Sequence, residues 1–162
     1  MLFDRITAPE GKEGFSIKNC LRPEGGCYSP LMQAERYTVL LDCKRESLID
    51  KIVLQEDTRY SQRVEAFTIE AFSGGRWKQI YSGTVIGFSK IARFRPVLTQ
   101  KLKITITACR KEPYLRTIQV FESDGTEVKT PKTLWLRKKA EELNYRLFIY
   151  AENHKATSKS AK

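Results

Sequence analysis

Five side chains able to act as acids, bases or hydrogen-bonding groups are concentrated in the segment IVLQEDTRYSQRV, residues 52–64. They lie between two apolar stretches and are Gln55, Glu56, Asp57, Gln62 and Arg63. Neighbouring carboxylates can serve general acid–base catalysis. Adjacent residues of a strand point to opposite faces, however, so Glu56 and Asp57 would need a bend to reach one substrate. We therefore expect no catalytic residue here, and a loop-pinning network in which Asp57 or Glu56 pairs with Arg63 or Arg59.

Aromatic residues near this segment raise the alternative of sugar binding. The four that could form a stacking platform are Tyr60, Trp77, Tyr81 and Phe88. Aromatic residues in strands usually pack in a core or against a cross-strand neighbour, which favours a structural role for Trp77 and Phe88. Tyr60 lies in the loop, beside Arg59 and Arg63, where it could hold a sugar hydroxyl.

The net charge of +10 favours acidic partners such as nucleic acid, an anionic membrane or an acidic protein surface. A basic run covers two expected strands and consists of Arg93, Arg95, Lys101, Lys103, Arg110 and Lys111. A charged strand face is usually only solvated. Together with the net charge, this run nevertheless predicts contacts with an acidic partner or with RNA phosphates. No RNA-binding signature indicates base-specific recognition.

The sequence predicts no metal site and no cofactor. The only histidine is His154, and the four cysteines, Cys20, Cys27, Cys43 and Cys109, contain no CxxC pair. Their even number permits two disulfides, but free thiols in a reducing, intracellular compartment are favoured. No apolar stretch is long enough to span a membrane, and the first residues contain no apolar run typical of a secretory signal.

Short β-strands separated by turns dominate the sequence between residues 36 and 122. The expected strands are 37–43, 49–55, 64–72, 76–81, 90–94, 102–109 and 115–122. Alternation is clearest in LKITITAC, where Leu102, Ile104, Ile106 and Ala108 share one face. The first 35 residues form irregular coil, with one short strand around 15–17. This pattern predicts an all-β fold, an antiparallel β-sandwich or jelly roll.

A different periodicity begins after Thr130–Pro131. Apolar residues recur at helical spacing and form one stripe: Leu136, Ala140, Leu143, Leu147 and Tyr150. We expect an amphipathic α-helix that either packs on the sandwich or docks on a partner. Basic residues of this helix and of the tail could contact phosphate or an acidic partner: Arg137, Lys138, Lys139, Lys155, Lys159 and Lys162.

Several ordered segments resemble the C-terminal discoidin-like module of family-29 α-L-fucosidases. That module contains a VLQEDI-type strand, a GQRV segment, a GGEWKEI hairpin, a GTTIGYKRILRF segment and an RKVRLTI strand. The similar segments here are Ile52–Thr58, Ser61–Val64, Gly74–Ile80, Gly83–Phe94 and Gln100–Ile106. The resemblance covers roughly residues 36–122. It implies a galactose-binding-like jelly roll, related to the coagulation-factor type C modules, and no catalytic activity.

The sequence departs from that module in two places. An Asp-rich loop that ends in an aromatic residue is replaced by PEGGCYSPLMQAERY, in which Tyr28 is the stand-in for the aromatic. Tyr28 is a ligand-binding candidate through the resemblance, and the loop residues Arg59, Tyr60 and Arg63 are the others. The helix and basic tail are additions. We expect an irregular segment over 1–35 that wraps the sandwich, a discoidin-like sandwich over 36–128, and the helix and tail over 129–162.

Two functions follow from these observations, and a hydrolase fragment with residual activity is a third, weaker option. The first is a non-catalytic structural subunit, anchored through its helix and tail to other protein subunits of a large assembly. An organellar ribonucleoprotein, such as one in mitochondria, would suit its charge. The second is a carbohydrate-binding module, either free or part of a split glycosidase.

Overall fold

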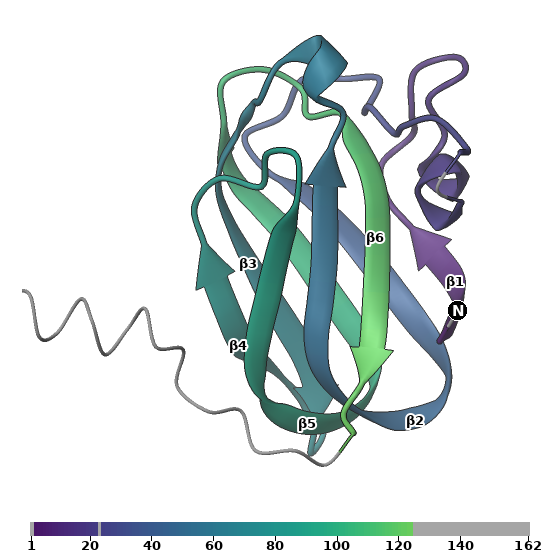
Figure 1. Ribbon diagram of the computed structural model, residues 1–162, viewed down its shortest axis with the longest axis vertical. Helices are drawn as coiled ribbons and strands as arrows, with labels where there is room; N and C mark the ends of the chain where they lie inside the picture. The colour runs from purple at the N-terminus through teal and green to yellow at the C-terminus, as the bar shows by residue number, and fades with distance from the viewer. Residues whose placement is uncertain (1, 23, 125–162) are drawn as a thin grey trace, which may run out of the picture. The chain divides into compact units, whose positions relative to one another are not determined.

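Six antiparallel β-strands form the part of the chain that this computed structural model describes, residues 2–22 and 24–124 (Figure 1). The all-β prediction is confirmed for these residues. The strands are β1 (Phe3–Thr7), β2 (Tyr37–Glu56), β3 (Val64–Ser73), β4 (Arg76–Gly83), β5 (Lys90–Cys109) and β6 (Leu115–Glu122). Two short 3-10 helices, η1 (Ile17–Leu21) and η2 (Thr58–Tyr60), lie in the connections.

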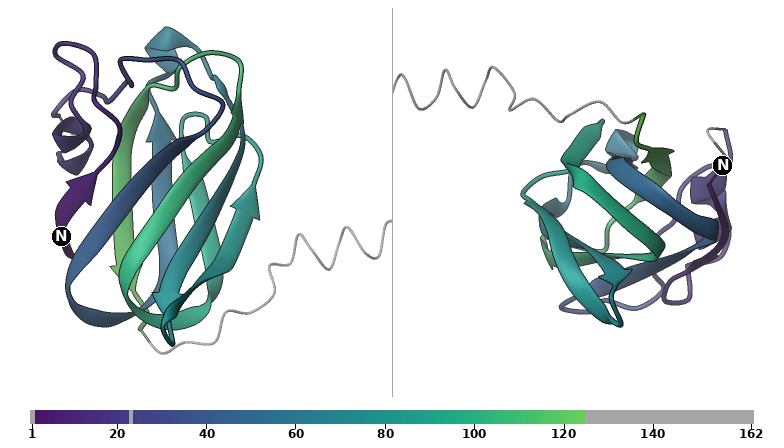
Figure 2. Two further views of the ribbon diagram at one scale, coloured as in Figure 1. Left: turned by 180° about the vertical axis from the view of Figure 1, so that it is seen from behind. Right: turned by 90° about the horizontal axis from the view of Figure 1, so that it is seen from below.

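The two 20-residue strands, β2 and β5, each contribute to two facing layers (Figures 1 and 2). In one layer, residues 37–42 of β2 pair with 101–106 of β5, between β1 and the β3–β4 hairpin. In the other, residues 51–54 of β2 pair with 90–93 of β5, and β6 joins the far side of β2. The strands thus form one continuous hydrogen-bonded sheet, and the sheet bends within β2 and β5 so that its two layers face each other.

The expected separation of 37–43 from 49–55, and of 90–94 from 102–109, is wrong. Each pair is one continuous strand, and its polar middle carries the chain from one layer to the other. The register between β2 and β5 shifts between Asp42 and Ser47, and Lys44 to Glu46 are exposed. A bend at the edge of the layers buries few side chains, so it needs no apolar pattern.

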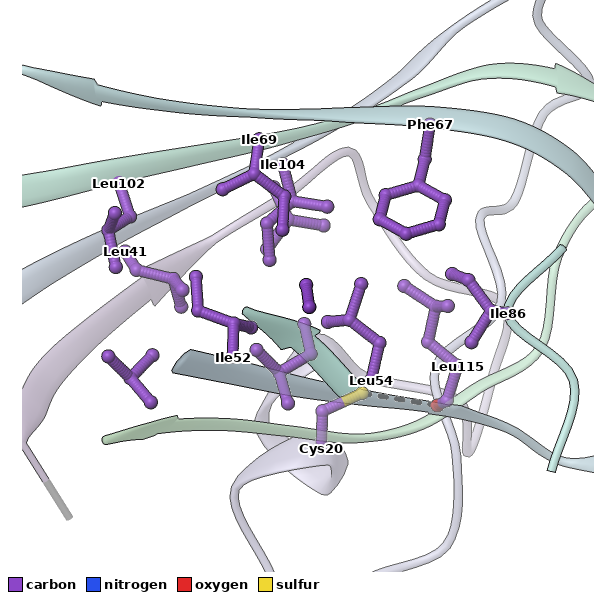
Figure 3. Close-up of a cluster of buried hydrophobic side chains, with 14 of the residues drawn as sticks. Cys20, Leu41, Ile52, Leu54, Phe67, Ile69, Ile86, Leu102, Ile104 and Leu115 are labelled. Atoms are coloured by element: carbon purple, nitrogen blue, oxygen red, sulfur yellow. Dashed lines mark hydrogen bonds between the residues drawn. The ribbon is translucent and has the colours of Figure 1, made fainter. Parts of the chain in front are cut away.

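Side chains from both layers interdigitate in one core (Figure 3). Leu102, Ile104 and Ile106 are at most 1% exposed, which confirms the inward face predicted for this segment. The opposite layer contributes Ile52 and Leu54. Burial of one such side chain stabilises the fold by about 1.5–3 kcal/mol, and this core fixes the strand ends from which the loops start.

The N-terminal segment contains an element that the sequence did not reveal. Strand β1 pairs with β2, although residues 1–35 were expected to be coil. Its signal is weak because Phe3 is its only buried residue, as suits a short edge strand. The strand predicted around 15–17 is also wrong. Ser16 instead caps η1 by accepting a hydrogen bond from the Lys18 amide, and η1 places Cys20 against Leu115.

The predicted C-terminal helix and tail lie outside the described residues, so the proposed division at 128–129 stays a prediction. No helix in the described ranges is long and apolar enough to cross a membrane. The four cysteines are free thiols.

Candidate functional site

Glu56, the last residue of β2, connects this strand end to two other segments through its side chain. The carboxylate is 1% exposed and accepts three backbone hydrogen bonds. Its Oε1 accepts from the amides of Arg63 and Val64 at 2.9 and 3.0 Å, and its Oε2 accepts from the amide of Gly87 at 2.8 Å. The end of β2 is thereby joined to the start of β3 and to the connection before β5. We call this end of the molecule, with residues 57–63, 84–89 and 110–114, the Glu56 end.

Asp57 forms the second carboxylate contact, with Arg59. The Nε and Nη2 atoms of Arg59 donate to Oδ1 and Oδ2 of Asp57 at 2.9 and 2.6 Å. Asp57 also caps η2 by accepting from the Arg59 amide. These hydrogen bonds lower the pKa of Asp57, because they stabilise the ionised carboxylate more than burial disfavours it. The Asp57 side chain is 2% exposed and that of Arg59 is 74% exposed, so the pair presents a guanidinium to solvent.

Arg63 bonds to loop backbone. Its Nε donates to the carbonyl of Tyr60 at 3.0 Å, and its Nη1 donates to the carbonyl of Glu112 at 2.9 Å. Its guanidinium carbon lies 4.8 Å from the centre of the Tyr114 ring. Arg63 therefore supports the aromatic side chains beside it.

Three aromatic rings from distant segments meet at the Glu56 end. Tyr60 stacks on Tyr114 with centroids 4.1 Å apart and planes at 11°. Phe15 packs edge-on against both, at 5.9 and 5.3 Å. Tyr60 remains 38% exposed. Sequence reasoning identified Tyr60 but missed Phe15 and Tyr114, since no local pattern joins positions 15, 60 and 114.

A polar cavity of about 380 Å³ adjoins Arg59 and is lined by Glu24, Gly26, Arg59 and Arg116. Arg116 forms no ion pair with any residue of the described ranges. A larger, more open cavity of about 540 Å³ is lined by Gln33, Ala34, Glu35, Glu65, Ala108 and Cys109. The first cavity presents two guanidinium groups, whose N–H groups can donate hydrogen bonds to the oxygens of a ligand.

Tyr28 cannot serve as the aromatic ligand contact that the resemblance implied. It is fully buried, and its hydroxyl donates to the carbonyl of Pro9 at 2.9 Å. Phe88, expected to pack in the core or against a cross-strand neighbour, is 70% exposed. Trp77 does pair across strands with Phe72.

Two of the five residues expected in the loop-pinning network lie outside its contacts. Gln55 accepts a hydrogen bond from Thr117 Oγ1 at 2.7 Å, on the outer face of β2 and β6. Gln62 is exposed and makes no side-chain hydrogen bond within the described residues. Glu56 and Asp57 contact loop backbone and Arg59. Arg63 contacts loop backbone, the Tyr114 ring and, at 4.0 Å, the Glu112 carboxylate.

The predicted basic run divides into neutralised and free cations. Lys103 pairs with Glu70, and Arg110 pairs with Glu65, both at 2.8 Å. In the part of the chain described here, Arg93, Arg95, Lys101 and Lys111 have no ion-pair partner. The remaining predicted contacts, including the helix stripe and the tail lysines, lie outside the described residues. Within residues 2–22 and 24–124, no group of three or more His, Cys, Asp or Glu side chains is arranged to hold a metal ion.

No family model matches the sequence. A curated relative from Oryza sativa subsp. japonica, provisionally named α-L-fucosidase 1, is 30% identical over 112 residues. That match covers 68% of this chain and 22% of the relative, so the chain spans about a fifth of the relative's length.

Solved structures share the fold. The structure of SpGH29 has a TM-score of 0.69 and 24% identity, over 75% of this chain and 27% of that one. The fold is also shared with chitosan-binding module 1 of a chitosanase/glucanase from Paenibacillus sp. IK-5, at a TM-score of 0.63 and 13% identity. That match covers 74% of this chain and 94% of the module. The resemblance seen in the sequence is thus confirmed: this chain is a homologue of the family-29 α-L-fucosidases over a minor part of their length, consistent with their C-terminal accessory module.

Proposed function

We propose that this chain is a non-catalytic carbohydrate-binding module with a galactose-binding-like jelly roll, and that it holds a sugar at the Glu56 end. Its likeness to the accessory part of fucosidase chains, and to the fold of a chitosan-binding module, supports this proposal. The observation that carries it is the stacked pair of Tyr60 and Tyr114, with Arg59 exposed beside it.

Tyr60 provides the apolar surface for a sugar ring. Aromatic rings stack on the C–H faces of sugars, and a ring fixed before binding loses little conformational entropy on contact. Tyr114 on one face and Phe15 at the edge hold Tyr60 in place, and Tyr60 is 38% exposed. Phe88 is a second exposed ring at this end, directly after Gly87.

Arg59 provides hydrogen-bond donors for sugar hydroxyls. A guanidinium has five N–H donors. Nε and Nη2 bind Asp57, so Nη1 and the second hydrogen of Nη2 stay available. Asp57 fixes the direction of these donors, and Arg116 lines the same cavity.

The burial of the two adjacent carboxylates supports a module without catalysis. Glu56 and Asp57 are each 1% exposed. Their oxygens accept hydrogen bonds from the protein itself, which leaves neither group positioned to exchange a proton with a substrate.

The test is binding of the full chain to a glycan array that includes fucosylated glycans and chito-oligosaccharides, followed by calorimetric titration of the best ligand. Tyr60→Ala should weaken that binding about tenfold or more, since it removes the stacking surface. Phe72→Ala is the matched control, because Phe72 is 37% exposed but lies at the opposite end of β3. Absence of glycan binding, or equal affinity of Tyr60→Ala and the unaltered chain, would refute the proposal.

The other function expected from the sequence, a structural subunit in an organellar assembly, depends on the helix and tail and stays a prediction. Co-migration of the native protein with a large, nuclease-sensitive particle would support it, and elution as an 18.7 kDa monomer would oppose it.

A further inference from the structure

Lys51 and Arg93 lie directly opposite each other on neighbouring strands. They are paired positions of β2 and β5, in the layer that also contains β6 (Figure 1). The adjacent residues Ile52, Ala92 and Phe94 are buried in the core. Because side chains alternate along a strand, Lys51, Arg93 and Arg95 all project from the outer face. We call these three residues the cationic row.

No residue of the described ranges forms an ion pair with the cationic row. Two other cations on the same strands are neutralised, Lys103 by Glu70 and Arg45 by Glu122. Asp50 lies in the register shift next to Lys51 and pairs with none of the three. Within the part of the chain that the structure describes, the row is thus a group of three cations on one face without a carboxylate partner.

Like charges directly opposite each other destabilise an antiparallel pair. Facing Cα atoms lie about 4.5–5.5 Å apart, so the two cationic side chains start from neighbouring points of one surface. The contact that Lys51 makes with Phe121, 4.1 Å from Nζ to the ring centre, holds its ammonium on this face. An anion bound between the two side chains would remove the repulsion and gain charge-assisted hydrogen bonds.

The side chains beside the row indicate the class of anion. Val53 pairs with Ile91 on one side and with Gln119 on the other. Ile91 is 56% exposed, and Gln119 is exposed. Val53 and Ile91 form an apolar strip that matches the C–H face of a sugar ring. The amide of Gln119 matches sugar hydroxyls, and the cationic row matches acidic substituents. Phe121, the aromatic ring of this face, is covered by Lys51 and is not free to stack on a nucleic-acid base.

We propose that the outer face of β5, β2 and β6 binds an acidic polysaccharide, with Lys51, Arg93 and Arg95 holding its sulfate or carboxylate groups. Arg93 and Arg95 are about 6.6 Å apart along β5, at about 3.3 Å per residue. Lys51 extends the row across the strands, so one chain of the polymer lies over all three cations. The surface is separate from the sugar site at the Glu56 end and does not depend on it.

Affinity measurements on the full chain test this surface. The probes are heparin for sulfate, polygalacturonate for carboxylate, dextran as a neutral polysaccharide, and poly(U) as RNA. The key variant is Arg93→Glu, because it places a carboxylate opposite Lys51 and keeps the contact of Lys51 with Phe121. The matched control is Arg76→Glu, an exposed arginine at the start of β4. Both variants change the net charge equally, so a general effect of charge cancels between them.

Heparin or polygalacturonate should bind, and the preferred polymer tells whether sulfate or carboxylate is recognised. Arg93→Glu should weaken that binding about tenfold or more, with no fall in melting temperature. Arg76→Glu should change affinity less than about threefold. Tyr60→Ala should leave heparin and polygalacturonate binding unchanged, which separates this face from the Glu56 end. Equal losses in the two arginine variants, no binding of either acidic polysaccharide, or tighter Arg93-dependent binding of poly(U) would each overturn the proposal.

Discussion

Glu56 and Gly87 are joined by two reciprocal hydrogen bonds across 31 residues of sequence. The amide of Glu56 donates to the carbonyl of Gly87 at 2.8 Å, and the amide of Gly87 donates to Oε2 of Glu56 at 2.8 Å. Backbone and side chain of one residue thus fix a single position in the connection between β4 and β5. Gly87 has a φ of 60°, a conformation that glycine adopts readily.

Replacement of the Glu56 carboxylate tests how much this connection contributes to stability. In Glu56→Gln, the side-chain NH2 must face at least one of the three backbone amides, which leaves buried donors without an acceptor. We expect the free energy of unfolding to fall by about 2–3 kcal/mol, measured by urea denaturation. Glu65→Gln is the control, because Glu65 forms an exposed pair with Arg110, and its loss should cost less than about 1 kcal/mol. Equal, small effects of the two variants would contradict the structural role of Glu56.

Acid stability should depend on Arg59 through Asp57. The folded-state pKa of Asp57 is lowered from 3.8, so the ionised group contributes stability above pH 3.8. This contribution is lost as the pH falls below 3.8 through the folded-state pKa. Arg59→Ala removes the largest cause of the lowered pKa while Asp57 stays buried. We expect its acid unfolding to begin at a higher pH, measured as melting temperature between pH 2 and 7.

Arg116→Ala provides the comparison for this experiment, because Arg116 is exposed and lines the same cavity without an ion pair to the described residues. Its acid unfolding should match that of the unaltered chain. An identical acid limit for Arg59→Ala would show that Asp57 does not depend on Arg59.

The features predicted from the sequence are those that depend on local patterns, such as alternating apolar residues and loop positions. The inward residues Leu102, Ile104 and Ile106 follow from alternation alone, and Tyr60 and Arg59 follow from their loop position. The continuity of β2 and β5 was not predictable in this way, because the bend at Lys44–Glu46 has exposed polar residues like those of a loop. Its strand conformation comes from pairing with distant parts of the chain.

The partners at the candidate site escaped prediction for the same reason. Phe15 and Tyr114 belong to segments without clear periodicity, and only the folded chain brings them to Tyr60. The burial of Tyr28 follows from its bridge to Leu115, 87 positions later. The opposition of Lys51 and Arg93 depends on the register between two long strands, which the sequence pattern of either strand leaves open.

The thiols should be unreactive in the folded protein at pH 8. Burial raises the pKa of Cys20 to about 12 and those of Cys27 and Cys43 to about 11, so these groups stay protonated and inaccessible. Cys109 is less buried and should react first with Ellman's reagent. All four should react in urea, and rapid release of several equivalents from the folded chain would contradict the buried positions.

The same thiols should limit stability at alkaline pH. A buried thiol with a raised pKa contributes stability below its ordinary pKa of 9.0 and loses it as the pH rises toward the folded-state value. We expect the melting temperature to fall between pH 9 and about 11. Cys43→Ala should fall less steeply with pH than the unaltered chain, and an equal slope would show that Cys43 does not contribute.

Ser61, which follows Tyr60, has an uncommon backbone conformation at the candidate site. Its φ is 68° and its ψ is 164°, a region that is almost exclusive to glycine and costs other residues about 1–3 kcal/mol. Ser61→Gly should relieve this strain and lose part of the gain to the larger entropy of the unfolded chain. We expect a net increase of about 0.5–1 kcal/mol in the free energy of unfolding. Ser61→Ala retains the Cβ atom and should give no increase, so a similar gain in both variants would assign the effect to the hydroxyl group. Because Tyr60 is held by Tyr114 and Phe15 and not by Ser61, glycan affinity of Ser61→Gly should stay within about twofold of the unaltered chain.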